Sequence, residues 1–118
     1  MKFSIYFAIF FGLQVPLAQG HTVWIHNKVT VGTLTAAAAT ETNEGSGFSW
    51  YGPYIDMHSE NAHKGYSLYI PDNKATFWLV FGVSGSLQEN KWRGPFNNDG
   101  DKCWHYHGTI DGWNVDEC

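Results

Sequence analysis

The chain has 118 residues and a formal net charge of −4, with seven basic against eleven acidic residues. This length suits one domain, close to the lower size at which a hydrophobic core holds without extra constraint. The acidic balance argues against nucleic acid and against a membrane surface as partners, since both favour a basic face. We expect a monomer.

The first 20 residues have the pattern of a signal peptide. Lys2 supplies a basic start, residues 3–13 form an apolar run, and Ala18-Gln19-Gly20 is a small-x-small cleavage site. The apolar run is shorter than the roughly 20 residues that span a bilayer. Cleavage after Gly20 would leave His21 as the first residue, and cleavage after Ala18 is the alternative. We therefore expect a secreted, extracellular protein with a single domain over residues 21–118.

The chain then alternates short apolar segments with turns. Residues 23–31 alternate apolar and polar side chains, which predicts a strand with one buried face. Residues 33–39 are small and featureless, residues 40–47 form a polar loop, and residues 48–51 predict a short strand.

The second half continues in the same way. A loop with histidines and acidic residues covers 56–65, and strands are predicted over 66–70, 75–83 and 104–110, with turns at 71–73 and 97–101. No segment has a convincing 3.6-residue period. The pattern predicts an all-β fold, an antiparallel immunoglobulin/fibronectin-like β-sandwich.

The two cysteines and the many aromatic residues add two expectations. Cys103 and Cys118 predict one disulfide, whose loop of about 15 residues would stabilise the fold by on the order of 3 kcal/mol. Among the six tryptophans, Trp78 is the best core candidate because it lies inside an apolar run. Other aromatic side chains would form a flat surface on which a polysaccharide stacks, the candidates being Trp24, Trp50, Tyr51 and Tyr54.

A histidine at a mature N-terminus offers two nitrogens to one metal ion, the α-amine and the ring. A second histidine ring would complete a planar three-nitrogen site, which suits Cu(II) among the first-row metals. The amine has a free pKa of about 7.7 to 8.0, so copper can displace its proton near neutral pH. The alternative is that His21 merely follows a cleavage site.

Six segments of the chain follow one another in an order and at spacings that are typical of one protein family. They are HTVWIHNKVTVG from His21, GTLTAAA from Gly32, Phe48-Ser49-Trp50, Ala62-His63-Lys64-Gly65 before YSLYI, FWLVFGVSGSLQENKW ending at Trp92, and NNDGDKCWHYHGTI from Asn97. In order and spacing they resemble the fungal cellulose-active lytic polysaccharide monooxygenases, auxiliary activity family 9, formerly called glycoside hydrolase family 61. The resemblance covers most of residues 21–110.

The resemblance implies that His21 and His63 bind copper and form the catalytic centre. It also implies a monooxygenase that cleaves cellulose or a related glucan oxidatively, with an external electron donor that reduces the copper. The chain departs from the family in three ways. It stops at Cys118 without the segment that brings a glutamine and an axial tyrosine to the metal, its cysteines fall elsewhere, and Tyr66 stands where a proline is common.

With these departures, the chain resembles a short or C-terminally truncated member of the family, and two other functions stay open. One is a non-catalytic secreted β-sandwich that binds copper or a glycan. The other is a secreted interaction or effector protein without a metal.

The remaining histidines have their own alternatives. His58 is the rival of His63 as second ligand. His105 and His107 share one face of their strand and would chelate a metal together, although such a pair is more commonly a solvated strand face. His26 is expected at the surface. The run Asp99-Gly100-Asp101 hints at calcium but lacks the spacing and terminal glutamate of a calcium loop.

Overall fold

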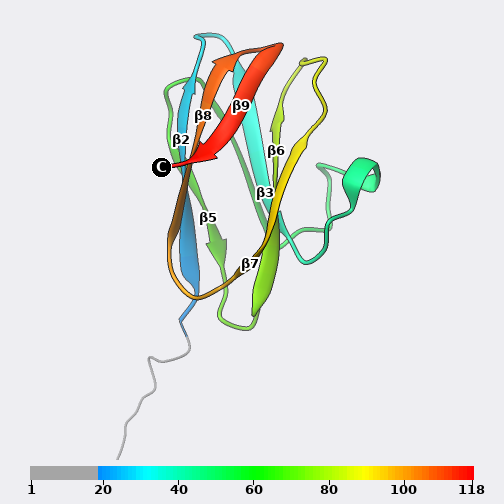
Figure 1. Cartoon of the computed structure of the whole chain (residues 1–118), viewed down its shortest axis with the longest axis vertical. Coiled ribbons are helices and arrows are strands. Elements are labelled where there is room, and N and C mark those ends of the chain that lie inside the picture. The colour runs from blue at the N-terminus through cyan, green and yellow to red at the C-terminus, as the bar shows by residue number, and fades with distance from the viewer. Residues whose placement is uncertain (1–18) are drawn as a thin grey trace, which may run out of the picture.

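A computed structural model describes residues 19–118, which fold into two stacked β-sheets (Figure 1). The first sheet has the strand order β5-β2-β8-β9 and the second the order β4-β3-β6-β7. The described strands are β2 (His21–Val29), β3 (Leu34–Thr40), β4 (Asp56–Asn61), β5 (Tyr66–Ile70), β6 (Thr76–Val83), β7 (Lys91–Asn97), β8 (Lys102–Thr109) and β9 (Gly112–Glu117). The predicted all-β sandwich is confirmed.

Most of the predicted signal peptide, residues 1–18, lies outside the described residues. Within residues 19–118, no helix is long and apolar enough to cross a membrane.

Neighbouring strands pair antiparallel, with one exception in the middle of the first sheet. There β2 and β8 run parallel, in a register that extends from Val23 opposite Lys102 to Val29 opposite Gly108. Five residues of β2 pair antiparallel with β5 on its other side. The central strand β2 therefore carries side chains that lie beside both β5 and β8.

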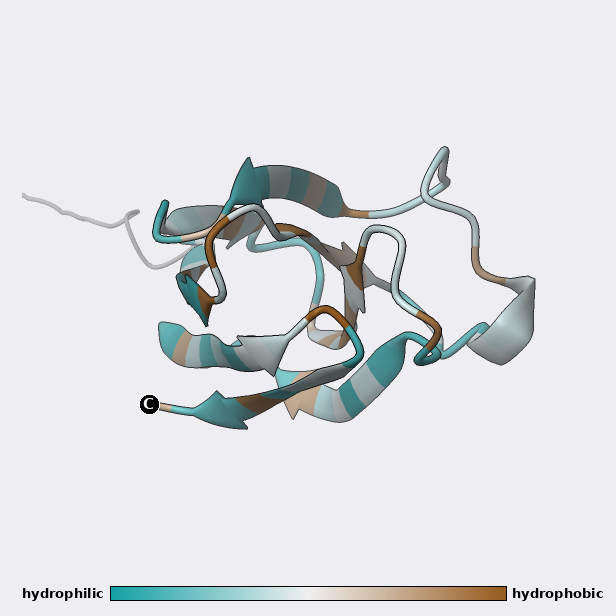
Figure 2. Cartoon of the chain, turned by 90° about the horizontal axis from the view of Figure 1, so that it is seen from above, coloured by the Kyte–Doolittle hydropathy of each residue, from teal (hydrophilic) through white to brown (hydrophobic). Residues whose placement is uncertain are grey.

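The core lies between the two sheets and follows from the period-2 alternation of the strands. Along β2 the residues Val23, Ile25 and Val29 are buried, while the residues between them face outward, except for the buried Asn27. Seen from above, the strands form two layers, with apolar and polar segments alternating along the ribbons (Figure 2). Trp78 was predicted as a core tryptophan, but the buried ones are Trp104 and Trp113, and Trp78 is half-buried.

Other predicted elements need correction as well. Residues 48–51 form no strand, since they follow the short 3-10 helix η3 (Gly45–Gly47) in a turn. Most of residues 33–39, expected to be featureless, belong to β3, and the expected loop 56–65 contains β4. Alanine has a low strand propensity, so a run of four alanines gives no strand signal. The strands β7 and β9 were not predicted.

The two sheets differ in what covers their outer sides. On the second sheet, Ala38, Thr40 and Val80 are buried although they do not belong to the core between the sheets. The segment 41–55 explains this, because its Phe48 and Trp50 pack edge to face and Phe48 also meets Trp92 of β7. We call the outer side of this sheet, β4-β3-β6-β7, the covered face. The segment that carries η3 projects on the side away from β2, β8 and β9 (Figure 1).

Candidate functional site

The two predicted copper ligands lie at opposite ends of the sandwich. His21 is the first residue of β2, and its ring Nδ1 lies 2.9 Å from Oδ1 of Asn98. His63 follows β4, and its backbone N–H donates to the carbonyl oxygen of Asn27 at 2.8 Å. Asn27 is six residues further along β2 than His21, which corresponds to about 20 Å of strand. Two imidazoles so far apart do not share one metal ion, so the structure does not bring His21 and His63 together.

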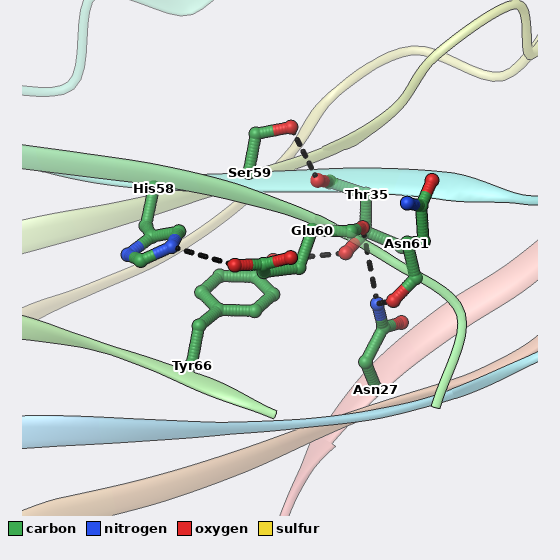
Figure 3. A network of polar contacts seen from close by, with 7 residues as sticks. All are labelled: Asn27, Thr35, His58, Ser59, Glu60, Asn61 and Tyr66. Carbon is green, nitrogen blue, oxygen red and sulfur yellow. Dashed lines mark hydrogen bonds and ion pairs between the residues drawn. The ribbon is translucent and has the colours of Figure 1, made fainter. Parts of the chain in front are cut away.

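The rival ligand, His58, belongs to a different network (Figure 3). Its Nε2 lies 3.1 Å from Oε2 of Glu60, and its ring stacks on Tyr66 with ring centres 5.2 Å apart. Nearby, Nδ2 of Asn27 donates to the carbonyl oxygens of Glu60 and Asn61. These contacts join β2, β4 and β5 at the side of the sandwich, which is a structural role.

The outer side of the first sheet, β5-β2-β8-β9, carries exposed and partly exposed side chains on each of its strands, and we call it the bare face. It consists of the outward-pointing side chains of β5, β2, β8 and β9, which alternate with the buried ones. They are Ser67, Tyr69, Thr22, Trp24, His26, Lys28, Cys103, His105, His107, Asn114, Asp116 and Cys118. Aromatic, imidazole and carboxylate groups thus share one strand-built surface.

One half of the bare face is aromatic. The Trp24 side chain is 51% exposed and that of Tyr69 is 53% exposed. Trp24 pairs with Ser67, and Tyr69 pairs with Thr22, so the two aromatic residues are diagonal neighbours on adjacent strands. Such neighbours have Cα atoms about 7–8 Å apart, which aromatic side chains can bridge. The Tyr69 phenol also occupies the space that a side chain at residue 20 would need.

The other half of the bare face carries three histidines. His26 on β2 is opposite His105 on β8, and the ring centres of His105 and His107 are 5.4 Å apart. On the far side, β9 places Asp116 opposite His105, and Oδ2 of Asp116 lies 2.6 Å from Nε2 of His107. This hydrogen bond from His107 lowers the pKa of the Asp116 carboxyl. His26 and His105 line a hollow of about 310 Å³ together with Lys28 and Cys118.

The predicted disulfide is present at the edge of this cluster. Cys103 and Cys118 are bonded to each other, with Cα atoms 5.4 Å apart. Their sulfur atoms and a ring nitrogen of His26 all lie within 4.8 Å of one another. Because the sulfurs are bonded to each other, neither is a thiolate that would coordinate a metal.

The predicted aromatic surface divides between the two faces. Trp24 lies on the bare face, whereas Trp50 packs over Gly82 on the covered face. Tyr51 is 98% exposed and Tyr54 less so, both in the segment beside Trp50. Tyr69 was missed as a surface aromatic because its strand, 66–70, reads as mostly apolar.

Comparison with known proteins identifies the fold class. The sequence matches no protein-family model and no curated protein. The structure is similar to the T6SS lipoprotein TssJ1 from Pseudomonas aeruginosa, with a TM-score of 0.52 and 5% identity over 86% of this chain and 97% of that chain. It is also similar to intermedilysin (TM-score 0.49, 9% identity) and to pneumolysin (0.49, 8%), over 84% and 86% of this chain. The matched part is 23% of each toxin chain. At these identities the likeness concerns the fold alone, an all-β sandwich of two sheets.

Proposed function

We propose that the chain is a secreted, non-catalytic glycan-binding module in which Trp24 and Tyr69 on the bare face stack against sugar rings. The observation that carries the proposal is the pair itself, two half-exposed aromatic side chains on adjacent strands of an uncovered sheet. The apolar side of a sugar ring packs on an aromatic face, and this burial contributes roughly 25 cal/mol per Å² of apolar area.

The surroundings of the pair favour a neutral polymer. Thr22 and Ser67, which pair with Tyr69 and Trp24, offer small hydroxyl groups for hydrogen bonds to sugar hydroxyls. The net charge of −4 disfavours anionic polysaccharides. Cellulose or a related glucan is the ligand class that we propose.

The proposal leaves out oxidative catalysis. A copper-dependent monooxygenase, with its copper and external electron donor, is what the sequence resemblance implied. The distance along β2 between His21 and the contact of His63 gives no support to a centre shared by these two histidines. Binding without turnover needs only the bare face.

Signal cleavage bears on the exposure of the pair. The Tyr69 phenol lies against Gly20, so cleavage after Gly20 would uncover more of the phenol, whereas cleavage after Ala18 would leave Gly20 in place. The mass of the secreted protein identifies the cut, and we expect His21 as its first residue.

The binding test uses the untagged secreted protein with insoluble cellulose and with soluble cello-oligosaccharides, followed by depletion and by tryptophan fluorescence. We expect Trp24→Ala and Tyr69→Ala each to weaken binding about tenfold, since each removes on the order of 1 kcal/mol or more of apolar contact. Tyr51→Ala is the matched control, because Tyr51 is more exposed but lies in the segment on the other sheet. We expect it to bind as the wild type does.

Three results would overturn the proposal. They are no binding to any neutral glucan, binding by Trp24→Ala that equals that of the wild type, and a loss of binding confined to Tyr51→Ala. Release of oxidised oligosaccharides with copper and ascorbate would overturn its non-catalytic part.

A further inference from the structure

We propose that the histidine half of the bare face binds one divalent transition-metal ion of the Zn²⁺ type through His26, His105 and His107. This site is separate from the aromatic pair and does not depend on glycan binding. It is also distinct from the copper site expected at His21 and His63.

The strand register brings three imidazoles onto one surface from two adjacent strands. His105 and His107 are two residues apart on β8, so both point outward, and His26 on β2 is the register partner of His105. An ion bound here would join β2 to β8, two strands that are far apart in the sequence.

The separation of the rings suits a shared ion. A Zn–N bond is about 2.0–2.1 Å long, and the centre of an imidazole lies about 1 Å beyond its nitrogen, so two imidazoles on one tetrahedral ion have centres about 5 Å apart. The ring centres of His105 and His107 are 5.4 Å apart. The ring nitrogens of His26, His105 and His107 do not all lie within 4.8 Å of one another in this structure. Both side chains on β8 are partly exposed, so they can rotate to aim a nitrogen of each ring at one ion.

Asp116 orients one of these rings. Oδ2 of the Asp116 carboxylate lies 2.6 Å from Nε2 of His107 and accepts a hydrogen bond from it. In the neutral imidazole that donates from Nε2, the other ring nitrogen, Nδ1, carries the lone pair that would bind a metal. Metal-binding histidines commonly donate their other ring N–H to a carboxylate, which fixes the tautomer and makes the ligand more basic.

The third ligand borders an open hollow. His26 and His105 line the hollow of about 310 Å³, so an ion held by these two rings at its edge would stay open to the water that completes a tetrahedral site. Lys28 also lines it and is the register partner of His107. Its positive charge opposes a cation, and the negative charge of Asp116 offsets it.

The nearby disulfide determines which atoms can coordinate a metal ion here. The sulfurs of Cys103 and Cys118 lie within 4.8 Å of a ring nitrogen of His26, but they are bonded to each other. With the disulfide intact, the donor set is nitrogen, which suits Zn²⁺ and its neighbours in the first row. Reduction would instead offer two thiolates with His26, a different site with a different metal preference.

The test measures Zn²⁺ binding to the untagged protein by calorimetry, without reductant and with the disulfide confirmed by mass. We expect one Zn²⁺ per chain, and Co²⁺ in its place should give the visible absorption of a tetrahedral site. His105→Ala and His107→Ala should each weaken binding at least tenfold. Asp116→Asn should weaken it by about 10- to 100-fold, the usual effect of losing such a carboxylate. Lys28→Gln should tighten it.

The matched control is His58→Ala, which removes a histidine that also has a carboxylate partner but lies on β4 of the other sheet. We expect it to bind Zn²⁺ like the wild type, as should His21→Ala and His63→Ala. Thermal unfolding of each variant shows whether it is folded, and the gain in affinity of Lys28→Gln tests the site without removing a ligand.

Four results would overturn the inference. They are no Zn²⁺ binding at millimolar concentration, binding that the His105 and His107 variants retain, binding lost in the His21 or His63 variant, and binding that appears only after reduction of the disulfide. The last result would place the metal on the cysteines.

Discussion

Outward-pointing residues are buried on one sheet of the sandwich and exposed on the other. On the covered face Ala38, Thr40 and Val80 are buried, and Trp50 of the segment 41–55 packs over Gly82 on the same side. On the bare face Trp24 and Tyr69 are half-exposed. An uncovered sheet face with large aromatic and imidazole groups carries its chemistry at the surface, whereas the covered face contributes to stability. The contrast predicts that substitutions on the two faces have different consequences.

The largest expected effect is on the covered face. Val80→Asp would place a charge at a position with no exposed surface, where no partner compensates it, and we expect a loss of about 3–5 kcal/mol in the free energy of unfolding. Trp24→Asp on the bare face puts the same side chain at a half-exposed position and should cost about 1 kcal/mol or less. Denaturant unfolding of both variants measures the difference.

Since Val80→Asp could fail to fold, Val80→Thr provides a milder test. It keeps the shape and adds one buried hydroxyl, with an expected cost of about 1–3 kcal/mol. If the Val80 variants lose no more free energy of unfolding than Trp24→Asp does, the segment 41–55 does not protect the covered face in solution.

The next largest effect comes from a tyrosine buried between the two sheets, which share one core despite their different outer sides. The Tyr66 hydroxyl on β5 lies 2.9 Å from Oγ1 of Thr35 on β3, in the other sheet. Burial raises the pKa of Tyr66 to about 12, although the hydrogen bond with Thr35 opposes the rise. The folded state therefore holds this proton more tightly than the unfolded state, whose pKa is about 10.

Stability from Tyr66 is fully present below pH 10 and is lost as the pH rises towards 12. At about 1.4 kcal/mol per pKa unit, the loss approaches about 3 kcal/mol. Tyr106, whose pKa burial also raises, contributes in the same direction. Denaturant unfolding across this pH range measures the loss, and Tyr66→Phe should show a smaller one. A flat profile in the wild type would mean that the hydroxyl is not buried between the sheets.

Sequence reasoning predicted the strands that alternate clearly and missed those that do not. The segment 66–70 matches β5 because its apolar residues repeat every second position. Strand β3 was missed because its alanines pack against both the core and the covering segment, so that neither side looks polar. Strand β7 was missed because it contains Gly94 and Pro95, residues that rarely indicate a strand.

The candidate sites depended on pairings that a sequence does not contain. The shared face of His105 and His107 followed from their two-residue spacing. The approach of His26 depends on the parallel pairing of β2 with β8, and Asp116 is placed by a strand, β9, that was not predicted. In the same way, the distance between His21 and His63 is set by the length of β2 and by where the turn after β4 meets it.

The smallest expected effect is on the bare face, in the pair formed by His107 and Asp116. The hydrogen bond from His107 lowers the pKa of Asp116 below its ordinary value, so the pair stabilises the folded state above about pH 4, the unfolded value, and this contribution is lost as the pH falls through the folded pKa. The carboxylate is exposed, so water screens the pair and the change in stability should be slight.

A titration of the Asp116 carboxyl by carbon NMR detects the effect directly. The pKa should be below the ordinary range in the wild type and should return to it in His107→Gln, while the unfolding curves of the two proteins stay nearly the same. If the carboxyl titrates alike in both proteins, the pair does not form in solution. A shifted pKa with almost no change in stability would instead mean that side chains on the bare face are ordered by contacts that contribute little to folding, unlike the buried residues of the covered face.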